Sequence, residues 1–298
     1  MLLGNMKKFL LALTAILCVT ILNAQRVTKD YRFSNITGIK ASSIYNIKLS
    51  KGNSDVVKIT ADERFFKNIK IYKDGNNTLV LEWDGSFKYR GDDKRNTEGI
   101  NVVMQVNSLE ELDLSGAVSL DGNGDTYPSR EFECELSGAA SAKNFNVNTC
   151  ETDLDLSGAG SVAFGGNYGK LEGEISGAGK AVLNGNTSDI ELEVSGAGSV
   201  DISNCDARMV DLELSGAGNV TLKGSTDRLK AIVSGAAALK AKELKAMDVI
   251  CYTSGASGAS VYCTGTLETK TTTASKITYY GNPRNIISHN QSLVKGRD

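Results

Sequence analysis

Residues 151–176 read ETDLDLSGAGSVAFGGNYGKLEGEIS and hold one complete copy of a unit that recurs along most of the chain. At its centre is the triplet Ser-Gly-Ala, which occurs eight times at spacings of 19 to 22 residues. The serines of the eight triplets are Ser115, Ser137, Ser157, Ser176, Ser195, Ser215, Ser234 and Ser254. Residues 273–277 resemble a ninth, degenerate copy. So regular a period indicates a solenoid, in which each unit stacks on the next.

Strand-like alternation flanks the triplets. Polar and apolar residues alternate at 153–156, before Ser157, and Val162 and Phe164 alternate with small residues after it. A period of two predicts a strand with one buried face, and no segment of helical period interrupts the repeats. The sequence therefore predicts an all-β parallel β-helix of about nine rungs, each of 19–22 residues. Leucine-rich repeats share the period, but their Leu-rich signature and usual helical segment are absent.

The triplet itself is predicted to be a structural turn. Glycine permits the backbone angles of a sharp bend, and alanine and serine fit where neighbouring rungs crowd the corner. Stacked serine hydroxyls can also hydrogen-bond along the column. The competing interpretation, eight nucleophilic serines, fails because no base or orienting residue recurs with them.

Composition divides the chain into four segments. Residues 1–24 are predicted to be a signal peptide: Lys7 and Lys8 precede the apolar run 9–22, and the small residue Ala24 precedes the expected cleavage point. The run is too short for a transmembrane helix, which needs about 20 residues. Residues 25–110 form an N-terminal β segment or capping rungs, 111–280 the repeat β-helix, and 281–298 a C-terminal cap or tail. The mature chain is thus expected to be exported, without a transmembrane segment.

The five cysteines of the mature chain do not suggest a disulfide framework. Their number is odd and they are widely scattered, so small buried core residues are the favoured interpretation. A bridge between Cys251 and Cys263 is the one pairing left open, to be decided by geometry. The single histidine, His289, argues against a multi-histidine metal site.

Two sequence motifs carry a resemblance to a known family. Residues 156–162 read LSGAGSV, a pattern repeated along the chain, and residues 277–283 read ITYYGNP. With the predicted signal peptide and N-terminal β segment, the chain resembles the bacterial head GIN domain family, described as autotransporter adhesins and abundant in Bacteroidetes. The resemblance implies a right-handed, single-stranded β-helix, an exported location and a role in adhesion. It implies no catalytic residues.

Alignment of the units on their triplets reveals two columns of acidic residues. Four residues before each serine stand Glu111, Glu133, Asp153, Glu172, Glu191 and Asp211, and two residues before it stand Asp113, Glu135, Asp155, Glu174, Glu193 and Glu213. Both positions fall on the same, outward side of the strand. Residues 111–213 contain 19 acidic and 5 basic residues, a net charge of −14, although the whole chain has a net charge of only −2. The next unit ends the pattern with Lys230 and Ile232.

Stacked carboxylates repel one another, by about 1 kcal/mol per neighbouring pair in a water-like dielectric. One hypothesis is that this acidic face binds divalent cations such as Ca²⁺, or a cationic ligand, through its oxygen atoms. The alternative is a solvated face that keeps the solenoid soluble. A second sequence signal for Ca²⁺, residues 121–125, resembles the start of an EF-hand loop but has Thr126 and Phe132 where that loop needs glycine and glutamate. We therefore expect an ordinary turn there.

These observations favour an exported, non-enzymatic β-helical binding or scaffold protein, an adhesin at the cell envelope, with a protein or glycan ligand. The alternatives are a periplasmic structural or envelope-stress-related scaffold and, third, a carbohydrate-active β-helix enzyme. Catalysis requires a distinguished acid and base, whereas here the carboxylates form a regular lattice. The near-neutral net charge argues against nucleic-acid binding. The location is expected to be the periplasm or the outer cell surface, and no cofactor other than Ca²⁺ is expected.

Overall fold

The computed structural model describes residues 26–85, 99–272, 274–289 and 292–296. These residues form one network of hydrogen-bonded strands and a single 3-10 turn, η1 (Glu63–Phe65). None of the described segments is a helix long and apolar enough to cross a bilayer. The predicted signal peptide, residues 1–24, lies outside the described residues. The prediction of an all-β solenoid with about nine turns, preceded by irregular strands, is confirmed.

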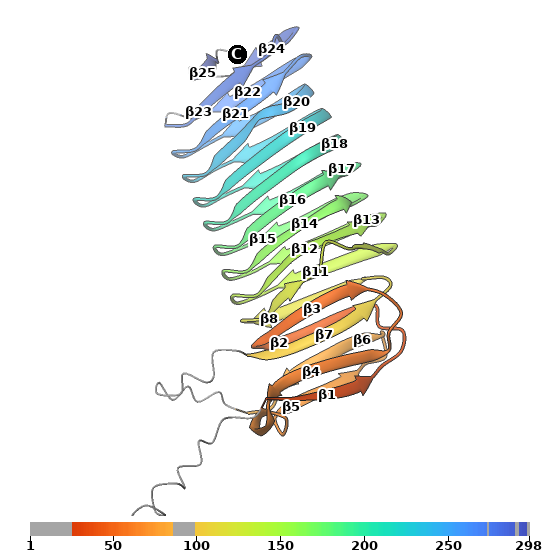
Figure 1. The fold of residues 1–298 in the computed structure, drawn as a ribbon. Coiled ribbons are helices and arrows are strands. Elements are labelled where there is room, and N and C mark those ends of the chain that lie inside the picture. The colour runs from red at the N-terminus through yellow and green to blue at the C-terminus, as the bar shows by residue number, and fades with distance from the viewer. Residues whose placement is uncertain (1–25, 86–98, 273, 290–291, 297–298) are drawn as a thin grey trace, which may run out of the picture.

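The solenoid has two parallel sheets joined at the triplets (Figure 1). The strands that precede the triplets form what we call the ladder sheet: β8 (Glu111–Gly116), β11 (Glu131–Leu136), β13 (Glu151–Leu156), β15 (Lys170–Ile175), β17 (Asp189–Val194), β22 (Thr266–Thr271) and β24 (Asn285–Ser288). The strands that follow them form the back sheet: β9 (Ser119–Asp121), β12 (Ser141–Asn148), β14 (Ser161–Asn167), β16 (Lys180–Asn186), β21 (Gly258–Cys263), β23 (Lys276–Tyr280) and β25 (Leu293–Lys295). Three long strands begin in the back sheet and end in the ladder sheet: β18 (Ser199–Leu214), β19 (Asn219–Val233) and β20 (Ala238–Thr253). A short strand, β10 (Thr126–Pro128), pairs with β12.

Each strand pairs in parallel with its equivalent in the next rung. Leu154 of β13, for example, stands opposite Cys134 of β11 and Gly173 of β15. The tail continues this pattern, because β24 pairs with β22 and β25 with β23. The described part of segment 281–298 therefore extends the two sheets.

The triplet glycines turn the chain at the corner between the two sheets. Gly158 has φ +74°, which side chains disfavour, and a Cβ atom there would lie 2.8 Å from the carbonyl oxygen of Gly138 in the rung before. That close approach lets the Ala159 N–H donate to the same oxygen at 2.7 Å. At this corner the backbone of each rung therefore packs directly on the backbone of the rung before, which explains the glycine in every copy.

Apolar side chains from both sheets fill the space between them. Four aromatic rings meet there: Phe145 and Phe164 stack with centroids 5.1 Å apart, and Phe132 and Tyr168 approach Phe164 edge-on at 5.8 and 5.3 Å. All four residues are buried, and the Tyr168 hydroxyl donates to the Phe164 carbonyl oxygen at 3.0 Å. This cluster joins consecutive rungs as well as opposite sheets.

The five cysteines among the described residues are free, and four of them are buried. Cys251 belongs to the ladder sheet, where it stands opposite Thr269, whereas Cys263 of the back sheet stands opposite Ala246. The Cys251–Cys263 bridge left open by the sequence is not formed: both cysteines are free, and they belong to different sheets. Cys150 alone is exposed.

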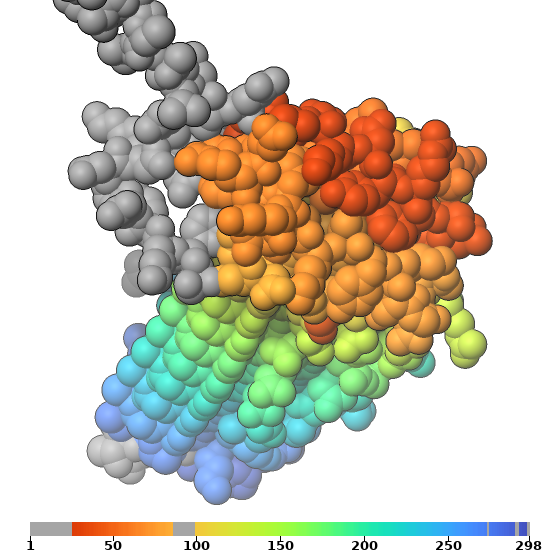
Figure 2. Space-filling view, turned by 90° about the horizontal axis from the view of Figure 1, so that it is seen from below, coloured from red at the N-terminus to blue at the C-terminus, as the bar shows by residue number. Residues whose placement is uncertain are grey.

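The N-terminal segment adds rungs in an order that differs from the order of the chain. Its strands are β1 (Arg26–Arg32), β2 (Gly38–Ser43), β3 (Tyr45–Lys51), β4 (Val56–Asp62), β5 (Ile69–Lys73), β6 (Thr78–Trp83) and β7 (Ile100–Val106). Strand β2 pairs in parallel with β6 on one side and with β8 on the other. Strand β3 likewise pairs in parallel with β7 and with β9. Among the described residues of this segment, three pairs are antiparallel: β1 with β4, β4 with β7, and β5 with β6. Figure 2 shows this module as a block at one end of the stacked rungs.

Candidate functional site: an acidic ladder

The twelve acidic residues of the two columns stand in register along the ladder sheet. We call this set the acidic ladder. The column four residues before the serines runs Glu111, Glu133, Asp153, Glu172, Glu191, Asp211, and the second column runs Asp113, Glu135, Asp155, Glu174, Glu193, Glu213. Each member is the direct neighbour of the next, so adjacent carboxylates are one rung apart, about 4.8 Å. No other face of the described structure has so long a run of one charge.

The alternation of the strands directs the ladder away from the core. In β13, Leu154 and Leu156 are buried, whereas Asp153 is half-buried and Asp155 is exposed. Ten of the twelve ladder carboxylates line a surface groove of about 560 Å³, and Lys230 lines its end. The groove therefore follows the long axis of the solenoid.

Basic residues close both ends of the ladder. At the N-terminal end, Lys40 of β2 forms an ion pair with Asp113, and the Thr78 hydroxyl donates to Glu111 at 2.5 Å. At the other end, Lys230 Nζ lies 2.8 Å from Asp211 Oδ2. Hydrogen bonds to their aspartate partners raise the pKa of both lysines. Sequence reasoning found Lys230, as the residue that ends the pattern, but missed Lys40, because its position depends on the rung order of the N-terminal module.

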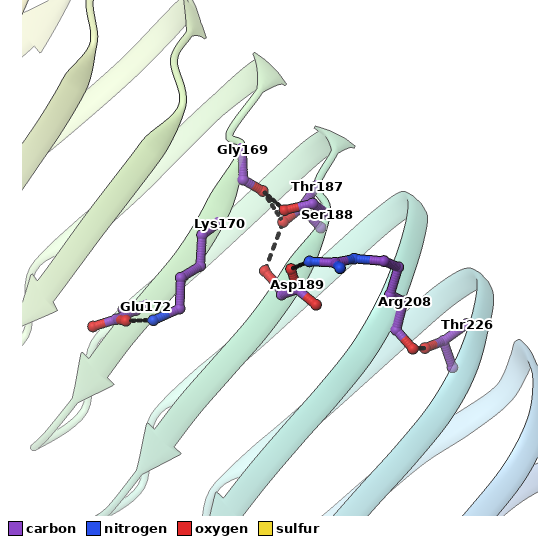
Figure 3. Close-up of polar contacts among 8 residues, drawn as sticks. All are labelled: Gly169, Lys170, Glu172, Thr187, Ser188, Asp189, Arg208 and Thr226. Carbon is purple, nitrogen blue, oxygen red and sulfur yellow. Dashed lines mark hydrogen bonds and ion pairs between the residues drawn. The ribbon is translucent and has the colours of Figure 1, made fainter.

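Further polar contacts lie beside the ladder, where the chain enters the ladder sheet (Figure 3). Lys170, at the start of β15, forms an ion pair with Glu172 of the ladder. One rung further, Arg208 forms an ion pair with Asp189, which lies outside the two columns. Thr187 donates to the carbonyl oxygen of Asp189 at 2.8 Å and holds the chain at this second corner. Of the three bases that pair with the ladder among the described residues, only Lys170 lies along its length.

Two members of the ladder, Glu133 and Asp153, have a raised pKa, and partial burial is the main cause for both. Desolvation, followed by repulsion from neighbouring ladder carboxylates, raises the pKa of Glu133 above its ordinary value. Desolvation, followed by repulsion from Glu151, also raises the pKa of Asp153, and Lys170 opposes that shift. The folded protein therefore disfavours the charged form of both side chains.

The carboxylates of the acidic ladder lie in two lines and do not converge on one point. No three His, Cys, Asp or Glu side chains in the described ranges converge on one point in a way that could hold a metal ion. At residues 121–125, the Asn123 N–H donates to Asp121 Oδ1 at 3.0 Å, and Asn123 and Gly124 both have positive φ, which is turn geometry. Ca²⁺ binding by the acidic ladder stays a prediction, and the ladder would offer an ion outward-facing oxygens from adjacent rungs.

The triplet serines contribute to the corner through their backbone. The Ser157 N–H donates to the Leu136 carbonyl oxygen at 2.9 Å, and the other repeats have equivalent bonds. Among the described residues, no hydrogen bond joins one triplet hydroxyl to another or to a base, so the expected hydroxyl ladder does not form. The nearest equivalent is a 3.3 Å contact between Ser141 and Ser119, which lie four residues after their triplet serines. His289 lies in the last turn, where its backbone N–H donates to Thr269.

Comparison with known protein families gives a match that spans most of the chain. The model of a family described as "Putative auto-transporter adhesin, head GIN domain" matches residues 35–221 and 174–283. The two ranges overlap, as expected when a repeated unit can be aligned in more than one register. No curated protein matches the chain.

Several solved structures from Bacteroidetes are similar to the chain. A "putative adhesin" from Parabacteroides merdae is 17% identical, with a TM-score of 0.49, and the match covers 92% of this chain and 98% of that one. A "putative adhesin" from Parabacteroides distasonis is 16% identical, with a TM-score of 0.47 and coverage of 92% and 97%. A "putative lipid binding protein" from the same species is 19% identical, with a TM-score of 0.45 and coverage of 92% and 98%.

Proposed function

The chain belongs to the family described as "Putative auto-transporter adhesin, head GIN domain". We propose that it is an exported, non-enzymatic binding protein of the cell envelope that holds a cationic ligand on its acidic ladder. The observation that carries the proposal is the groove of about 560 Å³ lined by ten register-matched carboxylates. The adhesin description of the family supports a binding role. The regular lattice of carboxylates, with no acid and base set apart, supports a role without catalysis.

The ladder has far more carboxylates than the nearby basic residues neutralise. Its only ion pairs with described residues are those of Lys40, Lys170 and Lys230, which leave nine carboxylates without a basic partner in that part of the chain. Repulsion among them costs stability, and a bound cation or cationic segment removes that cost. Binding and folding are then linked, because a ligand that binds only the folded state stabilises it.

The geometry favours an extended ligand with repeated positive charge. Six rungs at about 4.8 Å give the ladder a length of about 24 Å along the solenoid axis. A basic peptide segment or a polyamine fits this array better than a single chelated ion, because adjacent carboxylates present their charges along a line. Divalent ions such as Ca²⁺ would compete for the same oxygens.

The binding test uses the mature chain and a hexalysine peptide, with calorimetry at low ionic strength. We expect Glu191→Gln combined with Glu193→Gln to weaken binding by about tenfold, because each exposed charge pair contributes up to about 1 kcal/mol. The matched control is Asp201→Asn combined with Asp227→Asn, which removes the same charge outside the ladder. An equal loss in both double variants would show a general charge effect and would refute the ladder as the site. Ca²⁺ added at fixed ionic strength should displace the peptide.

Location is tested separately. Protease accessibility on intact cells, with a known periplasmic protein as control, should show cleavage of this chain if it functions as a surface adhesin. Protection would favour the alternative, a periplasmic scaffold that uses the same face. Release of reducing ends from polysaccharides by the purified chain would contradict the non-enzymatic role.

A further inference from the structure

A second cavity lies in the N-terminal module, near the N-terminal end of the ladder, where its lining residue Thr37 accepts a hydrogen bond from the Glu110 N–H. It has a volume of about 440 Å³, within the range of about 300–1,000 Å³ that is usual for small-molecule sites. Three connections line it, residues 33–37, 52–55 and 105–108, at the ends of β1, β3 and β7 and the start of β4. Neither the repeats nor the acidic ladder contributes a residue to it.

The exposed side-chain amides at this cavity form hydrogen bonds within its lining. Asn107 Nδ2 donates to Asn53 Oδ1, and the Ser54 N–H donates to Gln105 Oε1 at 3.3 Å. Gly52 allows the Gln105 amide to lie against the backbone, since a Cβ at residue 52 would be 2.4 Å from Oε1. These bonds leave the amino groups of Asn53 and Gln105 as donors and the Asn107 carbonyl oxygen as an acceptor.

Asp55 and Phe33 add a carboxylate and an aromatic ring to the lining of the cavity. Within the described part of the chain, the Asp55 carboxylate has no ion pair and no side-chain hydrogen bond, so it can accept bonds from a ligand. The half-buried Phe33 packs against the core and supplies an aromatic surface beside the amides. Among the described residues that line the cavity there is no lysine or arginine.

We propose that this cavity binds a neutral sugar residue. Each sugar hydroxyl is both a donor and an acceptor, and adjacent hydroxyls match the neighbouring amide donors and carbonyl or carboxylate acceptors found here. Phe33 offers the apolar side on which a sugar ring stacks. An anionic ligand is disfavoured by Asp55 and the absence of a lining base, and a lipid tail by the excess of amides and hydroxyls. The inference goes beyond the ladder, because it assigns a second site with a different ligand chemistry.

The test is saturation-transfer difference NMR on the mature chain, with methyl glycosides of glucose, galactose, mannose, fucose and N-acetylglucosamine at millimolar concentrations. We expect a saturable signal for at least one glycoside and its loss in Asn53→Ala combined with Gln105→Ala. The Asn76→Ala variant is the matched control, because it removes an exposed amide from the β5–β6 turn. Circular-dichroism melting establishes that each variant is folded.

Two further variants keep the test decisive. Asn107→Asp keeps the side-chain shape but removes the donor to Asn53 and adds charge beside Asp55, so it should also abolish the signal. This variant serves as the test if the double variant does not fold. Glu191→Gln combined with Glu193→Gln should leave sugar binding unchanged, which separates this site from the acidic ladder. Absence of a saturable signal with all five glycosides, or an undiminished signal in the folded cavity variants, would overturn the proposal.

Discussion

Gly196 illustrates how little freedom the triplet corner allows a single residue. Its φ is +82°, and a Cβ atom there would lie 2.5 Å from the carbonyl oxygen of Gly177, which already accepts the Ala197 N–H at 2.7 Å. We expect Gly196→Ala to lower the free energy of unfolding by about 1–3 kcal/mol through backbone strain alone, and by more if the stacked backbone must shift. Urea denaturation measures the change.

The control for this substitution is Gly75→Ala in the β5–β6 turn. A Cβ at residue 75 meets no atom within 4 Å, and Gly75 is not among the positive-φ glycines. Gly75→Ala should leave stability nearly unchanged. Equal losses in the two variants would contradict the corner argument.

Glu133 provides a prediction with a definite pH dependence. Its pKa in the folded protein is raised, so between its ordinary value and the raised one the folded state binds more protons than the unfolded state. Stability therefore falls as the pH rises through that window, and above it the charged form costs stability in full. We expect Glu133→Gln to raise the melting temperature at pH 7, with a gain that shrinks as the pH falls through the raised pKa.

Asp201→Asn is the control for Glu133→Gln. Asp201 lies on the back-sheet part of β18, where its neighbours are the uncharged Val182 and Thr221. Removal of this charge should not reproduce the gain at pH 7. A Glu133→Gln protein no more stable than the wild type would show that the charged form of Glu133 has no free-energy cost in the folded state.

At the scale of the element, the aromatic cluster between the sheets allows the packing contribution of one side chain to be tested. Phe164 contacts Phe132, Phe145 and Tyr168, with ring centroids between 5.1 and 5.8 Å away. We expect Phe164→Ala to cost about 3–5 kcal/mol of unfolding free energy, and Phe164→Leu clearly less, because leucine fills part of the cavity. Chemical denaturation of the two variants gives the comparison. Equal costs would indicate that contacts between rings contribute more than filled volume.

The strands of the repeats could be predicted from sequence, but the order of the N-terminal rungs could not. Alternation of period two locates β13 and the register of the acidic columns, because equal spacing from each serine fixes which residues are neighbours. Strands β2 and β3 show the same alternation, yet they lie between β8–β9 and the later strands β6–β7. Alternation reveals that a strand has a buried face but does not identify its partner. The Lys40–Asp113 ion pair and the sugar-binding cavity both depend on that order, so neither was visible in the sequence.

At the scale of the whole molecule, the near-neutral net charge conceals a strong separation of charge. Residues 111–213 carry a net charge of −14, whereas the flanking segments are positive. We expect the melting temperature to rise as salt increases from about 0.01 M to about 0.15 M, because the screening length shortens from about 30 Å to about 8 Å. Differential scanning calorimetry measures the shift.

The ladder variant identifies the source of that salt effect. Glu191→Gln combined with Glu193→Gln should reduce the dependence on salt, whereas Asp201→Asn combined with Asp227→Asn should reduce it less. A melting temperature that stays constant or falls with added salt would mean that attraction between oppositely charged segments outweighs repulsion within the ladder.

The in-register pairing of rungs also makes the chain a structure that recombination can lengthen or shorten. Lys170 stands opposite Glu151 on one side and Asp189 on the other, one repeat of 19 residues further along. Excision of residues 170–188 would place Asp189 opposite Glu151, with every inward residue still inward and the acidic columns one rung shorter. Unequal crossing-over between repeats in the gene can therefore change the reach of this surface in steps of about 4.8 Å while each corner and each sheet persists.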